Sequence, residues 1–409
     1  MSNKFSQSLI YLIYTGATGF FFSLVFTVNQ IYHIETVKLN PFQLVLVGTV
    51  LEASCFIFEI PTGIVADIKS RKLSVIIGLV LIGSAFIIEA SIPLFIVVLL
   101  SQLLWGLGYT FTSGADQAWI AEEVGEENLD SIYLKGAQVS QFFSLMGIIV
   151  STTIGAMIVN LPILMGGIFF VLLALFLMFF MKETNFTPID KEDRSSFKQM
   201  IHTFSQGIKF INGKWLLMIM LGISLLHGLY SEGFDRLWTA HFLKNIDFPD
   251  IINLKPIVWI GLINGIAMIL SIIAVEYIKR KMNKEGELKR VWILLIINIV
   301  MVLSIILLAL SRNFSLAFSM YLTFYIVRTT NGPIYGVLLN KNIKSQVRAT
   351  VISTYGQLDA LGQIIGGPII GLIALKTSIP FAMIISGVIL SPVIALYLYV
   401  FFKAKLKIS

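Results

Sequence analysis

Two glutamates inside a long apolar stretch are the residues of this sequence best suited to move a proton. Glu52 and Glu59 stand seven positions apart within residues 42–66. Seven residues of an α-helix turn through about 700°, so both carboxyl groups lie on one face. Burial favours the neutral form of a carboxyl group, which can then take up a proton on one side of a barrier and release it on the other. The spacing predicts proton coupling; the alternative is two polar residues satisfied by hydrogen bonds to a neighbouring helix.

The composition places this stretch in a membrane protein. Of 409 residues, 56% are hydrophobic and 13% charged, and the mean hydropathy is +0.86, which does not fit a soluble domain. One cysteine and four scattered histidines offer neither an intrachain disulfide nor a metal-ligand spacing. The net charge of +7 is ordinary for basic loops beside a membrane, so no nucleic-acid partner is expected. Without a catalytic constellation or nucleotide-binding loop, neither an enzyme nor a cofactor is expected.

Apolar segments recur along the whole chain, each close to the roughly 20 residues that cross about 30 Å of hydrocarbon. Twelve can be read, over residues 9–30, 42–66, 73–90, 94–118, 133–159, 162–181, 215–237, 256–278, 291–310, 314–340, 350–375 and 379–402. They predict an all-α integral membrane protein with twelve transmembrane helices in two halves of six.

Basic residues gather in alternate connections. With both termini in the cytoplasm, that side holds the lysines and arginines of residues 69–72, 182–214, 279–290 and 403–407, and few fall on the other side. Because basic residues are retained in the cytoplasm, this asymmetry predicts a multi-pass protein of the cytoplasmic membrane with both termini inside. A monomer in the lipid bilayer is the expected assembly.

The longest polar connection divides the segments into two sets. Residues 1–181 and 215–409 are predicted as two six-helix halves, joined by a cytoplasmic linker over residues 182–214. Apolar linker residues recur at helical spacing, namely Phe197, Ile201, Phe204, Ile208 and Ile211. They predict an amphipathic helix on the bilayer surface, either a structural tether or part of a gate.

Charged residues inside the second half need a reason, because an ionisable group in a membrane costs at least about 2.5–3.5 kcal/mol on insertion scales. Arg328 lies near the middle of residues 314–340 and Asp359 in the first half of residues 350–375. The two are expected to pair between adjacent helices. Such a pair is either structural or a switch, in which a proton on Asp359 frees Arg328 for an anionic group of a substrate.

The end of the seventh segment carries acidic residues beside an interfacial tryptophan. Glu232 and Asp235 precede Trp238 in residues 231–238. They are typical of ordinary anchoring at the membrane surface, with an external gate as the alternative. With Arg328, Glu232 and Asp235 are the candidate residues for substrate binding or a charge pair. Glu89, at the outer end of the third segment, is expected to reach toward the surface.

A short charged turn follows Glu59. Residues 59–72 read Glu-Ile-Pro-Thr-Gly-Ile-Val-Ala-Asp-Ile-Lys-Ser-Arg-Lys. Within this turn a glycine, an aspartate and a pair of basic residues follow one another at short intervals, namely Gly63, Asp67, Arg71 and Lys72. Asp67 can accept from the N-terminus of a neighbouring helix, while the basic pair can meet a carboxylate such as Asp116. The turn predicts a latch that opens repeatedly, and a simple positive anchor is the alternative.

This pattern resembles the loop between helices 2 and 3 of the major facilitator superfamily. Its extension back to Glu59 and Pro61 is similar to the tetracycline efflux proteins of the P class. The resemblance implies the twelve-helix major facilitator fold with pseudo-symmetric halves, and a turn that latches the cytoplasmic side when the cavity opens outward. It also implies that acidic residues at the places of Glu52 and Glu59 are needed for transport.

The rest of the chain follows the family pattern less closely. Glu276, Arg280 and Lys281 repeat the spacing of the first turn and predict a second gate motif. Gln102 stands where the helix-4 pattern of the superfamily has an arginine, so a proton relay through that arginine is absent. The glycine-rich antiporter pattern is degraded in the fifth segment, and its better counterpart is in residues 362–371, where glycines let helices pack closely.

These features predict proton-coupled efflux of a small amphipathic drug, tetracycline in particular, by alternating access. The expected partners are the drug and protons, with the proton gradient as driver. Glu52, Glu59 and Asp359 are the predicted proton-coupling residues. A multidrug or macrolide-type exporter and a proton-coupled importer on the same fold remain alternatives.

Overall fold

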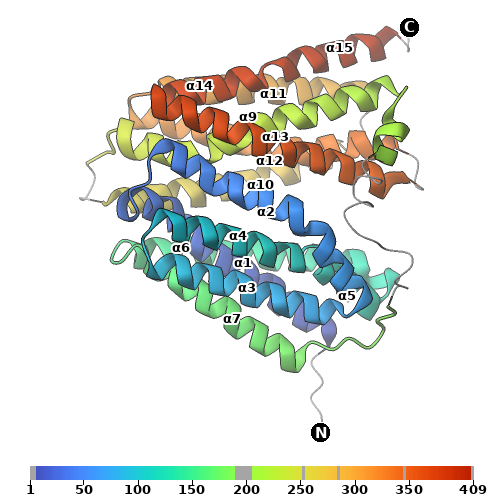
Figure 1. Cartoon of the computed structure of the whole chain (residues 1–409). Helices are drawn as coiled ribbons and strands as arrows, with labels where there is room; N and C mark the ends of the chain where they lie inside the picture. The colour runs from blue at the N-terminus through green and yellow to red at the C-terminus, as the bar shows by residue number, and fades with distance from the viewer. Residues whose placement is uncertain (1–5, 189–204, 251–253, 283–285, 344–346, 407–409) are drawn as a thin grey trace. The chain divides into compact units, whose positions relative to one another are not determined.

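The computed structural model describes residues 6–188, 205–250, 254–282, 286–343 and 347–406. Long α-helices make up most of these residues (Figure 1). Apart from one bridge between Asp247 and Asn313, the described ranges contain no β-structure. The predicted all-α class is confirmed.

The first part of the chain forms α1 Gln7–Ile31, a π-helical turn Tyr32–Thr36, α2 Pro41–Ile68, α3 Arg71–Ser91, α4 Phe95–Thr112, α5 Ala115–Val124, α6 Glu126–Gly155 and α7 Leu161–Phe180. The second part forms α9 Trp215–Asn245, α10 Pro256–Met282, α11 Glu287–Leu310, α12 Phe314–Lys341, α13 Arg348–Lys376, α14 Ile379–Leu390 and α15 Pro392–Leu406. All twelve predicted segments coincide with helix, and the differences lie at their ends.

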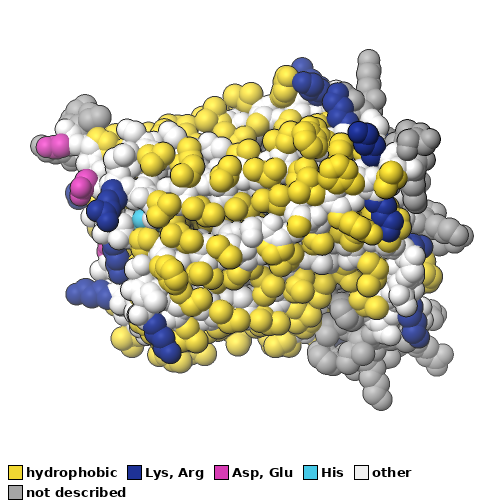
Figure 2. Space-filling view, turned by 90° about the horizontal axis from the view of Figure 1, so that it is seen from above, with side chains coloured by type: hydrophobic (Ala, Val, Ile, Leu, Met, Phe, Trp, Pro, Cys, Tyr) yellow, Lys and Arg dark blue, Asp and Glu magenta, His cyan; other side chains and the backbone are white. Residues whose placement is uncertain are grey.

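The helices have the length and surface of membrane-spanning segments. Eleven helical segments of the described chain are long and apolar enough to cross a bilayer. The remaining one, α12, has 28 residues and carries Arg328, Thr330 and Asn331 near its middle. Large apolar side chains such as Phe179 and Ile273 are exposed. Figure 2 shows a face on which hydrophobic side chains cover the middle, while Lys and Arg side chains stand toward its ends, as expected for a protein surrounded by lipid.

Two predicted segments are interrupted helices. The fourth is divided into α4 and α5 because Gly114 has φ +76°, a left-handed conformation that ends a helix and that glycine adopts without strain. The twelfth is divided into α14 and α15 at Ser391, directly before Pro392, whose ring cannot continue the hydrogen-bond ladder. The first break places α5 at the candidate site described below.

Contacts between helices define two compact units. Unit 1 contains Met1–Leu39 and Val50–Met200, and unit 2 contains Asn40–Thr49 and Ile201–Ser409. The start of α2 thus groups with unit 2, where Val45 and Phe42 pack against Gly371 of α13. The domain limits predicted above, 1–181, 182–214 and 215–409, stay a prediction, because the units are defined by contacts alone.

The predicted linker helix lies only partly within the described residues. Phe197, Ile201 and Phe204 fall outside them, while residues 205–211 are helical. Ile211 is fully buried, and a side chain at Gly207 would overlap Thr354 of α13. This last turn therefore packs against α13, and the amphipathic helix over the whole linker stays a prediction.

Glycines bring α9 and α13 into close contact in unit 2. A Cβ atom at Gly366 would overlap the carbonyl group of Leu229, and one at Gly362 would come within 2.6 Å of the carbonyl oxygen of Leu225. Both obstacles are backbone atoms, which cannot swing aside. The close packing predicted from residues 362–371 is confirmed.

We expect Gly366→Ala to destabilise unit 2 by about 1–3 kcal/mol, the usual cost of overpacking. Gly356, on the same helix, has nothing within 4 Å of an added Cβ, so Gly356→Ala is the matched control. The melting temperature of Gly356→Ala in detergent should equal or exceed that of the unsubstituted chain, because alanine stabilises a helix by up to about 1 kcal/mol relative to glycine. Equal melting temperatures for the two variants would contradict the backbone contact.

Candidate functional site

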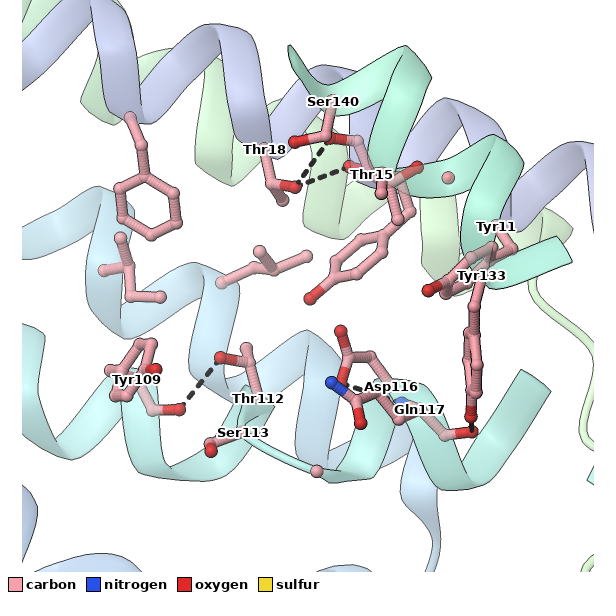
Figure 3. Close-up of a pocket in the computed structure, with 17 residues that line it drawn as sticks. Tyr11, Thr15, Thr18, Tyr109, Thr112, Ser113, Asp116, Gln117, Tyr133 and Ser140 are labelled. Carbon is pink, nitrogen blue, oxygen red and sulfur yellow. Dashed lines mark hydrogen bonds between the residues drawn. The ribbon is translucent and has the colours of Figure 1, made fainter. Parts of the chain in front are cut away.

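The break after α4 creates a pocket inside unit 1. Because Gly114 turns the chain, α5 begins in a new direction and presents Asp116 and Gln117 in its first turn. The pocket has a volume of about 460 Å³. Its lining residues are Tyr11, Tyr14, Thr15, Thr18, Phe22, Leu79, Ile82, Tyr109, Thr112, Ser113, Gly114, Asp116, Gln117, Tyr133, Gly136, Ala137 and Ser140. In Figure 3, α1 and α6 supply the side chains on one side, and α4 and α5 those on the other.

The lining combines aromatic rings and hydroxyl groups with a single carboxylate. The Tyr11 and Tyr133 rings lie 6.2 Å apart, and the Tyr133 hydroxyl donates to the Gln117 carbonyl oxygen at 3.0 Å. Tyr109 remains 46% exposed. Thr18 donates to the Tyr14 carbonyl oxygen at 2.8 Å, so part of the polar lining is already satisfied by backbone. Such a surface suits a ligand with both ring and polar groups.

Asp116 belongs to this pocket and not to the charged turn. Tyr14 lies beside its carboxylate, which accepts the backbone N–H of Gln117 at 2.8 Å. The predicted meeting of Asp116 with Arg71 and Lys72 is therefore wrong. The left-handed Gly114 separates α5 from α4, and α5 contacts α1.

Arg71 and Lys72, the basic residues of the turn, bind partners other than Asp116. Arg71 pairs with Asp67 at 2.8 Å and with Glu122 of α5 at 2.9 Å. Lys72 Nζ donates to the Met178 carbonyl oxygen at 2.8 Å. Gly63 has nothing within 4 Å of an added Cβ. Glu122 lies near the end of α5, so Glu122 and not Asp116 is the α5 carboxylate that pairs with Arg71.

Glu183 caps α3 at the same turn. Its carboxylate accepts the backbone N–H groups of Arg71 at 2.6 Å and Lys72 at 3.3 Å, and the Ser70 hydroxyl at 2.5 Å. A carboxylate at a helix N-terminus satisfies donors that have no partner within the helix and interacts favourably with its dipole. Glu183 thus has the role that the sequence assigned to Asp67.

We expect Glu183→Ala to lower stability by about 0.5–2 kcal/mol, as the loss of a helix cap does. The N-terminal turn of α3 should then exchange its amide hydrogens faster, which hydrogen exchange with mass spectrometry can measure. Glu127→Ala, an exposed acidic residue in the first turn of α6, is the control. Unchanged exchange in α3 would show that Glu183 does not cap it.

The predicted proton-coupling pair lies on α2 in unit 1. Ser54 donates to the Leu103 carbonyl oxygen at 2.8 Å, and the Cys55 thiol lies 3.8 Å from the Gly106 carbonyl oxygen, so α2 packs on α4 through small residues. Glu59 is exposed and Glu52 half-buried. Both carboxyl groups lie within electrostatic range of Tyr109, a residue of the pocket. Their part in transport stays a prediction.

In unit 2, Arg328 binds a different carboxylate from the one predicted. Arg328 forms a two-pronged ion pair with Asp235 of α9, in which Nη2 lies 2.7 Å from Oδ2, and its guanidinium lies 5.6 Å from the Phe324 ring centre. Asp359 instead accepts from Gln363, one turn further along α13, at 2.9 Å. The predicted Arg328–Asp359 pair is wrong because Asp235 offers both carboxylate oxygens to the planar guanidinium.

The remaining predicted residues pair within their own helices. Glu232 is 4% exposed and lies 2.8 Å from Arg236, one turn later on α9. Glu276 and Arg280 form an exposed pair at 2.7 Å on α10. Lys281 lies 5.7 Å from the ring centre of Tyr277. An external gate at Glu232 and a second gate at Glu276 stay predictions.

Glu89 occupies a buried polar cluster that sequence reasoning missed. It is fully buried, and its carboxylate lies 2.8 Å from His33 Nε2 and accepts the side-chain amides of Asn29 at 2.5 Å and Gln102 at 2.9 Å. The expectation that it reaches the surface is wrong. Two of its partners, Asn29 and Gln102, are polar residues within predicted apolar segments, and this is the signal that could have indicated the cluster.

Comparison with known proteins identifies the class. A model of the Major Facilitator Superfamily matches residues 8–367. An uncharacterized MFS-type transporter of Bacillus subtilis (strain 168), YxaM, is 22% identical over 357 residues, which are 87% of this chain and 86% of that protein. The chain belongs to the Major Facilitator Superfamily, and is a multi-pass membrane transporter and not an enzyme.

Solved structures agree on the fold. The nucleoside transporter NupG matches with a TM-score of 0.77 at 15% identity, over 97% of this chain and 99% of that chain. A bacterial homolog of the human lysosomal transporter Spinster matches with a TM-score of 0.73 at 12% identity, over 96% of this chain and 95% of that chain. At such low identity these likenesses show the architecture alone.

Proposed function

We propose that this transporter exports a small amphipathic drug in exchange for protons, by alternating access. The observation that carries the proposal is the unit 1 pocket, in which rings, hydroxyl groups and the Asp116 carboxylate line about 460 Å³. A pocket of a few hundred Å³ suits a drug-sized compound. Tetracycline is the specific candidate, because residues 59–72 are similar to those of its P-class exporters.

Proton coupling is assigned to carboxyl groups on apolar helices. Glu59 is exposed, as a group that exchanges protons with water must be, and Glu52 lies two turns away on the same helix. Asp359 lies on α13. Proton uptake makes such a group neutral, which lowers the free-energy cost of placing it in an apolar region. The difference in cost between the charged and neutral forms can shift the equilibrium between the inward-open and outward-open states.

The charged turn is proposed as the latch. Arg71 bridges Asp67 and Glu122, whose side chains are 12% and 27% exposed, and these ion pairs are the contacts that would break and re-form in each cycle. With basic loops inside, the turn lies on the cytoplasmic side of the plasma membrane, together with both termini. A monomer contains the whole pocket.

Drug susceptibility of cells tests the proposal. Cells producing the chain should tolerate higher concentrations of tetracycline than cells producing Glu59→Gln at equal membrane abundance. A macrolide in the same panel tests the alternative drug class. Unchanged susceptibility to every compound would contradict efflux, and increased susceptibility would indicate an importer.

A further inference from the structure

Asp116 has no cationic partner among the residues that the structure describes. Its carboxylate accepts the backbone N–H of Gln117 at 2.8 Å and lies beside the Tyr14 hydroxyl, and no ion pair of the described residues includes it. The ion pairs of the neighbouring turn engage Asp67 and Glu122 instead. A carboxylate that is partly withdrawn from water without a positive partner is electrostatically unsatisfied, and a cation that enters the pocket gains that interaction.

The tyrosines add a second preference for positive charge. Tyr11, Tyr14, Tyr109 and Tyr133 all line the pocket that contains Asp116. The faces of aromatic rings attract a cation electrostatically, and several rings around one site can enclose a substituted ammonium group that has no N–H to donate. Hydroxyl groups alone would favour a neutral polar ligand; rings together with a carboxylate favour an organic cation.

The polar groups of the pocket disfavour anions. No Lys or Arg is among the lining residues, so a phosphate or carboxylate of a ligand would face Asp116 without compensation. Phe22, Leu79 and Ile82 supply an apolar wall, which suits the hydrophobic body of an amphipathic molecule. The lining therefore offers Asp116 to the cationic end of a ligand and an apolar wall to its hydrophobic end.

We propose that the unit 1 pocket binds the positively charged end of an amphipathic organic cation, with Asp116 as its counter-ion and the tyrosine rings as its cage. The export of such a cation rests on the proposed function. The binding of the cation in this pocket does not depend on the direction of transport. A substituted ammonium or phosphonium group is the ligand class. Tetracycline, which carries a dimethylammonium group, belongs to it.

Binding of tetraphenylphosphonium to the purified full chain tests this inference. In equilibrium dialysis, the unsubstituted protein should bind this permanent cation, and Asp116→Asn should weaken binding about tenfold or more, since the amide keeps the shape but not the charge. Asp130→Asn, the same change at an exposed residue of α6 in unit 1, should leave binding unchanged. Tyr14→Phe should retain most of the affinity, because the ring remains.

A neutral probe of similar shape, triphenylphosphine oxide, separates charge from shape. Its affinity should be the same for the unsubstituted protein and for Asp116→Asn. The inference is overturned if the unsubstituted protein does not bind the phosphonium, if Asp116→Asn binds it equally well, or if both probes weaken together. Drug transport that fails while the charge preference persists would contradict the proposed function alone. Transport of a cationic drug that proceeds equally well in Asp116→Asn would contradict the inference alone.

Discussion

Glu59→Gln is expected to abolish proton-driven accumulation of substrate while the protein still inserts into the membrane. Glutamine has nearly the same shape and polarity as a protonated glutamate, so packing should survive. What it loses is the ability to bind and release a proton. Because Glu59 is exposed on α2, its replacement leaves no buried partner without a hydrogen bond. Substrate that equilibrates across the membrane but does not accumulate is the expected result in proteoliposomes with an imposed pH gradient.

Glu127→Gln provides the matched control for this variant. It makes the same chemical change at an exposed glutamate in the first turn of α6, outside the pocket. Accumulation should be normal in this variant. Full accumulation by Glu59→Gln would remove Glu59 from the coupling mechanism and leave Glu52 or Asp359 to carry the proton.

Glu89→Leu is expected to destabilise unit 1 strongly. Glu89 and His33 are 0% and 2% exposed, and the carboxylate is the acceptor for the amides of Asn29 and Gln102. Removing it leaves a buried imidazole and two buried amides without their acceptor. Leaving a buried polar group without its hydrogen-bond partner costs about 1–3 kcal/mol for each group. The melting temperature of the purified protein in detergent should therefore fall well below that of the unsubstituted chain.

The double variant His33→Leu, Glu89→Leu tests the cause of this loss. With both ends of the pair apolar, no buried imidazole is left without its hydrogen-bond partner, so the double variant should be more stable than Glu89→Leu alone. Additive losses would show that the two side chains are not coupled. A Glu89→Leu melting temperature equal to that of the unsubstituted chain would show that the cluster does not stabilise unit 1.

The helices could be predicted because hydropathy and length act locally. Every predicted segment matches a helix, since about 20 apolar residues in a row have no other way to satisfy their backbone in lipid. Even α12, interrupted by Arg328, was found from the apolar residues on either side. The close contact of α9 with α13 was visible in the glycines of residues 362–371.

The partners of charged residues could not be predicted in the same way. Which carboxylate meets Arg71 depends on the direction in which α5 leaves α4, and this is set by the left-handed conformation of Gly114. Nothing in hydropathy or length marks Gly114 as left-handed, so the pocket around Asp116 could not be predicted. Arg328 likewise had two acidic candidates on different helices, and hydropathy does not rank them.

Substrate loading of inverted membrane vesicles tests the central claim, which is proton-for-drug exchange. In these vesicles the cytoplasmic face is outside, so acidifying the lumen imposes the gradient that drives export. The account predicts that labelled tetracycline accumulates in the lumen on acidification and leaves when a protonophore collapses the gradient. Vesicles that expel or ignore the drug on acidification, with the chain present and inserted, would contradict the account.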